Sequence, residues 1–324
     1  MQHRTFWLDS SDGVPLYVNH WRAEGVPGVP ARGVLMVAHG MAEHSGRYAR
    51  FAEALVAAGF DVYAHDQRGH GQTAQHGNLG HYADQDGWAR VVGDLSTLNH
   101  HIRQQYPQTP IFLFGHSMGS YIAMAYLMRH SSSVQGAILS GSNYQPVRVY
   151  QAAALVARLE RWRQGPSGRS ALIDGLSFGA FNKAFKPART AFDWLSCDTA
   201  EVDRYIADPL CGFRCTNQLW LDLLAGLQHI TRIADLKQID PQLPVLIIGG
   251  ERDPVSKGNR LMHLADALGR SGHASTTLKQ YSQARHELLN ELNRDEVTRD
   301  LIDWLEQALE QPRHRPSLPQ ESNP

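Results

Sequence analysis

The chain has 324 residues, of which 42% are hydrophobic, and this is enough to bury a large core. Lys and Arg together number 31 against 32 Asp and Glu, so the basic excess that attracts phosphate backbones is missing and nucleic acid is excluded as a partner. The most apolar stretches, Val34–Ala38 and Val245–Ile248, are far shorter than the roughly 20 residues of a membrane span. We therefore expect no transmembrane helix.

The amino-terminal residues become charged early and lack the apolar run and small-residue cleavage site of a signal peptide, which leads us to expect a cytoplasmic protein. In that setting the three cysteines, Cys197, Cys211 and Cys215, are expected as reduced, buried thiols. Cys211 and Cys215 have a spacing that suggests a metal site, but no neighbouring Cys-His pair completes the four ligands of zinc. The sequence predicts neither a metal nor a cofactor.

Short β-rich runs alternate with helix-length segments, which is typical of a mostly parallel sheet with helices on both faces. The chain opens with a hairpin of Arg4–Leu8 and Leu16–Trp21 around Ser-Ser-Asp-Gly. Six further strands are expected at Gly33–Ala38, Asp61–His65, Ile111–Phe114, Gly136–Leu139, Val245–Ile248 and Thr276–Gln280. Apolar residues at helical spacing predict helices at Tyr48–Ala58, Trp88–Gln105, Met118–Arg129, Arg260–Leu268 and Asp295–Leu309. These elements predict an α/β fold with eight strands.

The alternation breaks after the sixth strand, where no strand-like run appears and apolar residues recur at helical intervals. A structureless connection of this length is improbable in a compact domain, so residues 142–232 are predicted to form an inserted helical cap. Residues 1–141 and 233–310 form the predicted core. Four prolines and no periodicity in Gln311–Pro324 predict a disordered tail.

The clearest chemical motif is Gly-His-Ser-Met-Gly at 115–119, which follows the buried run Ile111–Phe114 and precedes a helix. A sharp turn between a strand and a helix holds a serine in strained backbone and exposes its hydroxyl above the sheet. Glycines on both sides leave room for the helix and the strand to approach. Ser117 is therefore the candidate nucleophile.

A serine hydroxyl needs a base to remove its proton, and the base must be oriented by a third group. In this architecture the acid follows a late strand and the histidine comes last. Asp253 follows the strand Val245–Ile248, at the edge where open α/β sheets place their sites. Glu251 is the competing acid, but it lies closer to the strand end. His286 follows the last strand and is the candidate base.

Ester hydrolysis also requires donors for the charge that develops on the carbonyl oxygen. The backbone N–H of Met118, directly after the nucleophile, is one expected donor. The loop after Gly33–Ala38 is expected to supply the other through the N–H of Met41.

Together these residues resemble the monoacylglycerol lipase and lysophospholipase group of α/β-hydrolases. The resemblance covers the predicted core, and the motifs that carry it are His39-Gly-Met-Ala-Glu-His-Ser-Gly-Arg-Tyr48, Asp66-Gln-Arg-Gly-His-Gly71, Gly115-His-Ser-Met-Gly119, Glu251-Arg-Asp253 and Arg285-His-Glu287. It implies the α/β-hydrolase fold, a triad of Ser117, Asp253 and His286, and oxyanion donors at Met41 and Met118. Other residues that match the motifs are expected to shape loops around the site: Glu43, His44, Arg47, Asp66, Arg68 and His70.

The resemblance implies hydrolysis of the ester of a lipid with one acyl chain, most simply a monoacylglycerol, without a cofactor. Apolar cap residues such as Phe178 and Phe181 either line a tunnel for the acyl chain or pack the cap against the core. The cap is also where we expect transient contact with a membrane surface. The alternatives are a lysophospholipase, a broad carboxylesterase, a proline-releasing peptidase and a ligand-binding protein without catalysis. Epoxide and haloalkane hydrolases attack with an aspartate, which Ser117 excludes.

Overall fold

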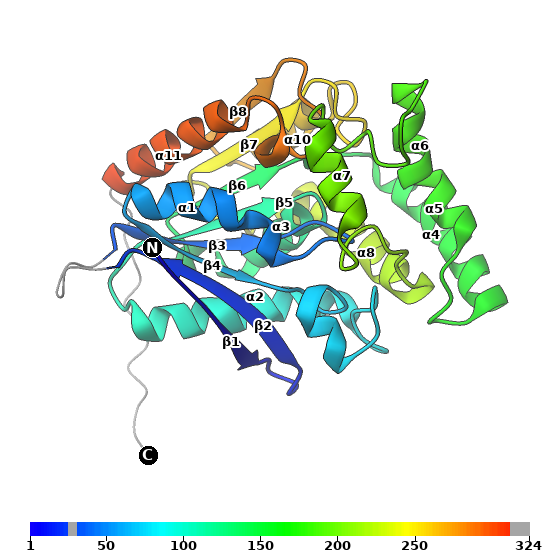
Figure 1. The fold of residues 1–324 in the computed structure, drawn as a ribbon, viewed down its shortest axis with the longest axis horizontal. Helices are drawn as coiled ribbons and strands as arrows, with labels where there is room; N and C mark the ends of the chain where they lie inside the picture. Colours follow the sequence, from blue (N-terminus) through cyan, green and yellow to red (C-terminus); the bar gives the residue numbers. More distant parts are fainter. Residues whose placement is uncertain (25–30, 312–324) are drawn as a thin grey trace.

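The computed structural model describes residues 1–24 and 31–311, so the predicted tail lies outside the described residues except for Gln311. Within this part, eight strands form one sheet in the order β1-β2-β4-β3-β5-β6-β7-β8 (Figure 1). The strands are β1 Gln2–Asp9, β2 Pro15–Arg22, β3 Gly33–Ala38, β4 Phe60–His65, β5 Ile111–His116, β6 Gly136–Ser140, β7 Val245–Gly250 and β8 Thr276–Tyr281. Strand β2 pairs antiparallel with β1 and β4, and all other pairings are parallel. The predicted fold class is confirmed.

The central strands are buried on both faces, as parallel strands between helical layers must be. Successive side chains of a strand point to opposite faces, and β3 illustrates this. Val34 and Met36 join the hydrophobic cluster on one face, whereas Leu35 and Val37 join the cluster on the other. The sheet therefore separates two cores.

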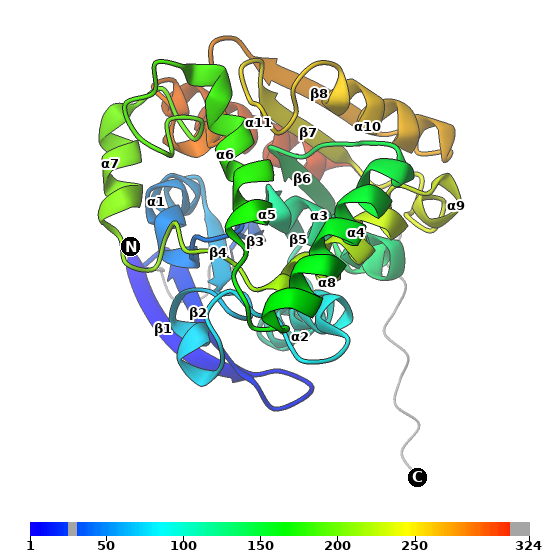
Figure 2. The same cartoon turned by 90° about the vertical axis from the view of Figure 1, so that its right-hand side faces the viewer.

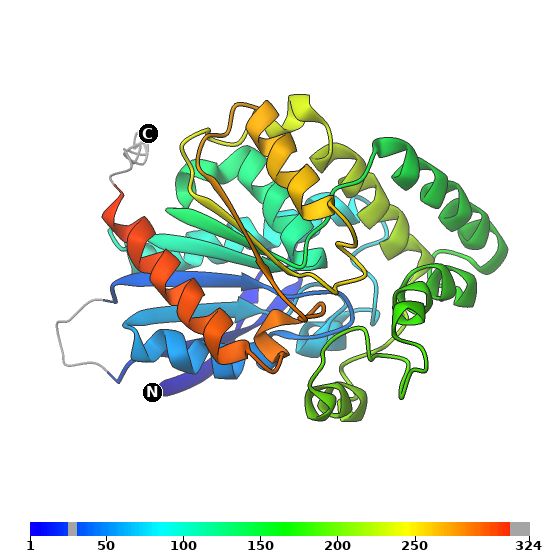
Figure 3. The same ribbon diagram turned by 90° about the horizontal axis from the view of Figure 1, so that it is seen from above.

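Helices cover both faces of the sheet (Figure 3). One core includes side chains of α1 (Ala49–Ala57) and α11 (Arg294–Glu310). The other includes side chains of α2 (Gly87–Gln105), α3 (Met118–His130), α8 (Asn217–Ile230) and α10 (Arg260–Arg270). Short 3-10 turns occur at Ser45–Tyr48, Gly71–His76, Ser131–Ser133, Lys183–Phe185 and Leu288–Asn290. No helix in the described residues combines the length and apolarity needed to cross a bilayer.

Between β6 and β7 the described chain contains helices and no strand. In order they are α4 (Val147–Gln164), α5 (Ala171–Leu176), α6 (Phe178–Asn182), α7 (Thr199–Ala207), α8 and α9 (Ile233–Leu236). Figures 1 and 3 both draw α4, α5 and α6 beyond the end of the sheet. By contrast, the leucines of α8 and the buried side of α4 belong to the same hydrophobic cluster as α2 and α3. Part of the predicted cap is thus packed as core.

Candidate functional site

The strand-turn-helix motif brings Ser117 to the end of β5, directly before α3. Its backbone angles are φ +51° and ψ −119°, a left-handed conformation that is strained for a residue with a Cβ. A Cβ on Gly119 would collide with the carbonyl oxygen of Ala38, and one on Gly115 would collide with Gly119. The two glycines therefore allow the close contact of helix and strands that leaves the Ser117 side chain partly exposed.

His286 and Asp253 meet at the same edge of the sheet, on the loops that follow β8 and β7. His286 Nδ1 lies 3.0 Å from Asp253 Oδ2, and both side chains are buried. The other carboxylate oxygen, Oδ1, accepts the N–H of Val255 at 2.8 Å, and Oδ2 also accepts the Ser256 hydroxyl at 3.1 Å. Because an ionised carboxylate only accepts, Nδ1 carries the proton and Nε2 is left as the acceptor. The competing acid, Glu251, is exposed.

The electrostatic surroundings of His286 favour its charged form. Burial lowers the pKa of His286, but the charge of Asp253 and its hydrogen bond oppose this effect, and the net shift is upward from 6.5. Its neighbour His116, whose ring centroid is 4.8 Å away, behaves in the opposite way. Burial and the nearby His286 lower the pKa of His116 to about 4. Of these two histidines, only His286 has a raised pKa.

Ser117 and His286 open onto one cavity of about 250 Å³. No hydrogen bond joins Ser117 Oγ to His286 within the described part of the chain. Such contacts are often long in an unliganded site and shorten when substrate binds. The shared cavity still brings the candidate nucleophile and base to one reaction space.

The loop that contains Met41 is held by polar contacts on its core side. The N–H of Gly40 donates to Glu43 Oε1 at 2.5 Å. His39 Nε2 accepts the N–H of Gln67 at 2.9 Å, so His39 Nδ1 carries the proton and donates to the Gly40 carbonyl at 2.7 Å. In a planar trans peptide this turns the N–H of Met41 away from His39. Met41 lines the cavity.

Met118, the other predicted donor, is the first residue of α3. Its side chain is buried, and its sulfur accepts the hydroxyl of Tyr82 at 2.8 Å. The side chain is therefore committed to the core, and only the backbone N–H remains for chemistry. Within the described residues, neither the N–H of Met41 nor that of Met118 donates a hydrogen bond.

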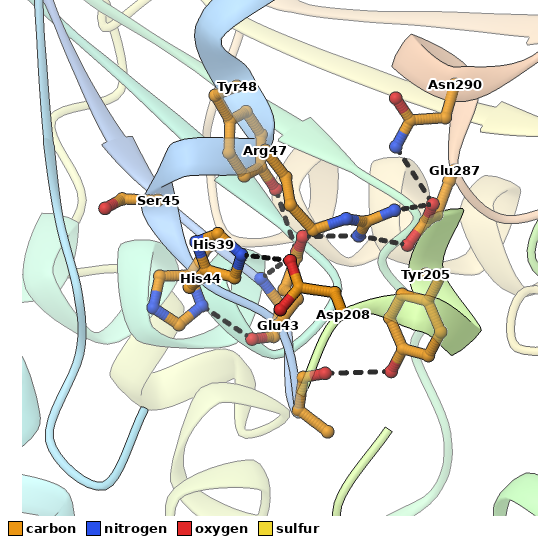
Figure 4. A network of polar contacts seen from close by, with 12 residues as sticks. His39, Glu43, His44, Ser45, Arg47, Tyr48, Tyr205, Asp208, Glu287 and Asn290 are labelled. Atoms are coloured by element: carbon orange, nitrogen blue, oxygen red, sulfur yellow. Dashed lines mark hydrogen bonds and ion pairs between the residues drawn. The ribbon is translucent and has the colours of Figure 1, made fainter. Parts of the chain in front are cut away.

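A buried ionic network lies next to this loop, as Figure 4 shows. Arg47 donates to both carboxylate oxygens of Glu287 and to Glu43 Oε2, each at 2.7 Å. Glu43 Oε1 also accepts the hydroxyl of Tyr48 at 3.0 Å. Burial raises the pKa of both carboxyls, but the Arg47 charge more than offsets this and keeps each pKa below its usual value. The network thus places two carboxylates and one guanidinium beside the site, in line with the predicted loop-shaping role of Glu43 and Arg47.

Aromatic side chains from the segment between β6 and β7 line the same cavity. Phe178 lines it, and its ring is stacked on that of Trp194 with the centroids 5.7 Å apart. Trp194 also contacts the His286 ring, at 5.0 Å between centroids. Phe181 is not among the lining residues; it packs behind them, 5.2 Å from the Trp194 ring. The two phenylalanines therefore occupy different environments.

Lining residues that were absent from the sequence prediction include the aromatic Trp194 and Tyr205. Neither belongs to a motif, and each meets the core only through the tertiary fold. The only signal in the sequence was that both residues are aromatic, and this does not distinguish a residue that lines the cavity from one that packs within the cap.

Among the described residues, one group of three potential metal ligands lies close together: His44, Asp208 and Cys211, with ligand atoms within 4.8 Å of one another. His44 Nδ1 accepts the N–H of Gly46 at 3.2 Å, so Nε2 carries the proton and donates to Asp208 Oδ2 at 2.9 Å. Burial raises the pKa of Cys211 and disfavours the thiolate that a metal requires. This chemistry suits a polar contact between loop and cap better than a metal.

The chain is similar to known proteins in both sequence and structure. Residues 29–293 match the family described as serine aminopeptidase, S33. Human monoglyceride lipase is 30% identical over 312 residues, which cover 91% of this chain and 86% of that protein. The monoacylglycerol lipase of Mycolicibacterium smegmatis is 29% identical over 308 residues, 90% of this chain and 93% of that protein.

Among solved structures, a thermostable carboxyl esterase from Bacillus coagulans in complex with glycerol superposes with a TM-score of 0.86. It is 27% identical, and the match covers 95% of this chain and 99% of that one. Both the sequence and the fold therefore match along nearly the whole length. The chain belongs to the serine aminopeptidase S33 family of α/β-hydrolases and is a carboxylic ester hydrolase of the monoacylglycerol lipase-like type.

Proposed function

We propose that the chain hydrolyses lipid esters with a single acyl chain, monoacylglycerol first among them, through Ser117, His286 and Asp253. The observation that carries the proposal is the shared cavity: Ser117 and His286, whose Nδ1 contacts Asp253, line a space that aromatic side chains line as well. The acyl chain of such a substrate needs an apolar lining, and its ester group needs the polar side chains of Ser117 and His286.

The chemistry would proceed in two halves. Ser117 Oγ attacks the ester carbonyl carbon while His286 Nε2 takes its proton, and the negative charge moves to the carbonyl oxygen near the N–H groups of Met41 and Met118. When the carbon–oxygen ester bond breaks, His286 returns the proton to the leaving alcohol. Water then attacks the acyl-enzyme through the same groups and releases the fatty acid. Asp253 holds the imidazole in the tautomer that this exchange requires.

The substrate class rests on the size and lining of the cavity. The volume of about 250 Å³ lies just below the usual range for ligand sites and favours one acyl chain over two or three. Glu43, Glu287 and Arg214 add polar groups to the lining, which suits a leaving alcohol with free hydroxyls. The relatives named as monoglyceride lipases support the same substrate.

A hydrolysis panel tests the substrate class. Purified protein is assayed with monoacylglycerol, lysophosphatidylcholine, diacylglycerol, triacylglycerol, p-nitrophenyl butyrate and a prolyl amide. We expect the highest kcat/KM on monoacylglycerol. Preference for lysophosphatidylcholine would select the lysophospholipase alternative, and cleavage of only the prolyl amide would select the aminopeptidase activity in the family description.

The acyl-chain wall gives a prediction about chain length. Each methylene buried in the tunnel is worth about 0.8 kcal/mol, so kcat/KM should rise several-fold per added carbon until the chain fills it. Phe178→Ala should flatten this rise, because Phe178 lines the cavity. Phe181→Ala is the matched control, since it removes the same ring from the layer behind. Equal loss in both variants on acetyl and dodecanoyl esters would assign both rings to packing alone.

The pH profile gives a prediction about the base. Neutral His286 accepts the Ser117 proton, and its pKa is raised above 6.5, so kcat/KM should fall as the pH drops through a value above 6.5. Burial lowers the pKa of His39 and His116 to about 4, which leaves them neutral across this range. A profile of kcat/KM from pH 5 to 9 measures this fall in activity on the acid side. Constant activity down to pH 5 is incompatible with His286 as the base.

The predicted membrane contact gains support from apolar side chains on α4 and α5, at the end of the molecule that faces the viewer in Figure 2. Leu155, Leu159 and Trp162 lie on one face of α4, and Trp162 is 83% exposed. Arginines on the same helix would favour anionic lipid headgroups. Co-sedimentation with anionic and neutral vesicles tests the contact, and the measurement is repeated with Trp162→Ser. Equal sedimentation of both proteins would show that Trp162 takes no part in membrane binding.

A further inference from the structure

The candidate oxyanion loop contains a strained residue that is not a glycine. Ala42, directly after Met41, has φ +56°, in the left-handed region that residues with a Cβ disfavour. The core holds the loop on its other side, through His39 and Glu43. Neither of these contacts reaches the carbonyl of Ala42. The strained conformation therefore needs a further restraint.

That restraint comes from the segment between β6 and β7. The Ala42 carbonyl oxygen accepts two hydrogen bonds, one from the Tyr205 hydroxyl at 2.8 Å and one from the N–H of Gly212 at 2.9 Å. Asp208, which lies between them in sequence, bonds His44 at 2.9 Å (Figure 4). Residues 205–212 thus hold the loop by hydrogen bonds to Ala42 and His44.

The contacts of the Tyr205 side chain hold its hydroxyl in place as a hydrogen-bond donor. It is buried, and the Arg47 guanidinium lies over its ring, 4.9 Å from the centroid. Phe192 packs against the same ring at 5.1 Å. Burial raises the pKa of the Tyr205 hydroxyl well above its usual value, so the group stays protonated and can donate. Its position is set by side chains from both the core and the cap.

We propose that Tyr205 is a positioning residue of the proposed reaction. By holding the Ala42 carbonyl, it keeps the Met41 N–H directed at the reacting carbonyl oxygen. The orientation of this N–H therefore depends on the contact between the cap and the loop. The free-energy cost of a left-handed alanine and the gain from one hydrogen bond are of similar size. When the Tyr205 bond is lost, the remaining Gly212 bond only offsets this cost, so the loop leaves its competent conformation for much of the time. The inference rests on the proposed function, because it presumes a role for Met41.

Tyr205→Phe tests the inference, since it removes the hydroxyl and keeps the ring over Arg47. We expect kcat to fall about tenfold with KM unchanged, below the loss from deleting an oxyanion donor outright. Affinity for an alkyl trifluoromethyl ketone, whose adduct carries the oxyanion, should fall in parallel. The assay uses p-nitrophenyl butyrate as well as monoacylglycerol; a loss only on monoacylglycerol, through KM, would mean that Tyr205 binds the glycerol instead.

Tyr144→Phe is the matched control. The Tyr144 hydroxyl donates to the Thr231 carbonyl at 2.7 Å, a bond of the same kind away from the loop. Both variants should lose similar thermal stability, but only Tyr205→Phe should lose kcat. Equal kcat for both would overturn the positioning role.

Ala42→Gly provides a second test, because glycine adopts a positive φ without penalty. When Tyr205→Phe is combined with Ala42→Gly, it should lower kcat less than threefold relative to Ala42→Gly alone. An undiminished tenfold loss in the double variant would show that the hydroxyl does not act through strain at Ala42. Labelling by a fluorophosphonate separates the two proposals: absence of Ser117-dependent labelling in the unaltered chain defeats the proposed function, whereas labelling with unchanged Tyr205→Phe kinetics defeats only this inference.

Discussion

Ser117→Ala is expected to lower ester turnover by about 10⁵-fold and to abolish labelling by a fluorophosphonate. Without the hydroxyl no acyl-enzyme can form, and only the binding and the oxyanion donors remain to assist direct attack by water. A kcat measurement with single-turnover sensitivity, together with gel detection of the labelled protein, checks both outcomes.

Because the backbone of Ser117 is strained, a second substitution at this position separates loss of activity from loss of stability. Ser117→Gly should be as inactive as Ser117→Ala, yet more stable by roughly 1 kcal/mol, because glycine adopts φ +51° freely. Urea denaturation compares the two variants. Ser142→Ala is the control for a second nucleophile, since Ser142 is buried and its Oγ has no partner within the described residues. If labelling survives in Ser117→Ala but disappears in Ser142→Ala, the nucleophile is Ser142 and not Ser117.

The sequence predicted the elements and the loops of the site because both depend on local pattern. Strands such as Val245–Gly250 are apolar throughout, and parallel strands bring their following loops to one edge. Asp253 and His286 could therefore be assigned as neighbours although they are 33 positions apart in the sequence. The helix predicted from Tyr48 begins at Ala49 instead, because a 3-10 turn capped by His44 precedes it.

Contacts between the cap and the core were beyond the reach of sequence patterns. Helical periodicity predicted apolar cap helices, but it could not tell that leucines of α8 face the core while Leu155 faces solvent. It also could not separate Phe178, which lines the cavity, from Phe181, which packs behind it. The bond between Tyr205 and Ala42 joins residues 163 positions apart, and no local signal in either residue announces it.

Asp253→Asn is expected to lower kcat by about 10⁴-fold, the magnitude measured for the equivalent change in the best-studied serine protease triad. The geometry gives the reason for this chain. Oδ1 of residue 253 accepts the N–H of Val255 at 2.8 Å, so the asparagine oxygen should stay there and its NH₂ group should replace Oδ2. An NH₂ group facing His286 Nδ1 can only donate, which moves the imidazole proton to Nε2.

With its proton on Nε2, His286 cannot accept from Ser117, and the base is lost while the fold remains. Glu251→Gln is the control, because Glu251 is exposed and lies on the same loop; we expect less than a twofold change in kcat. Fluorophosphonate labelling should slow in Asp253→Asn and stay normal in Glu251→Gln. If Glu251→Gln proves the more damaging change, the acid of the triad is Glu251, and the 3.0 Å contact between His286 and Asp253 has only a structural role.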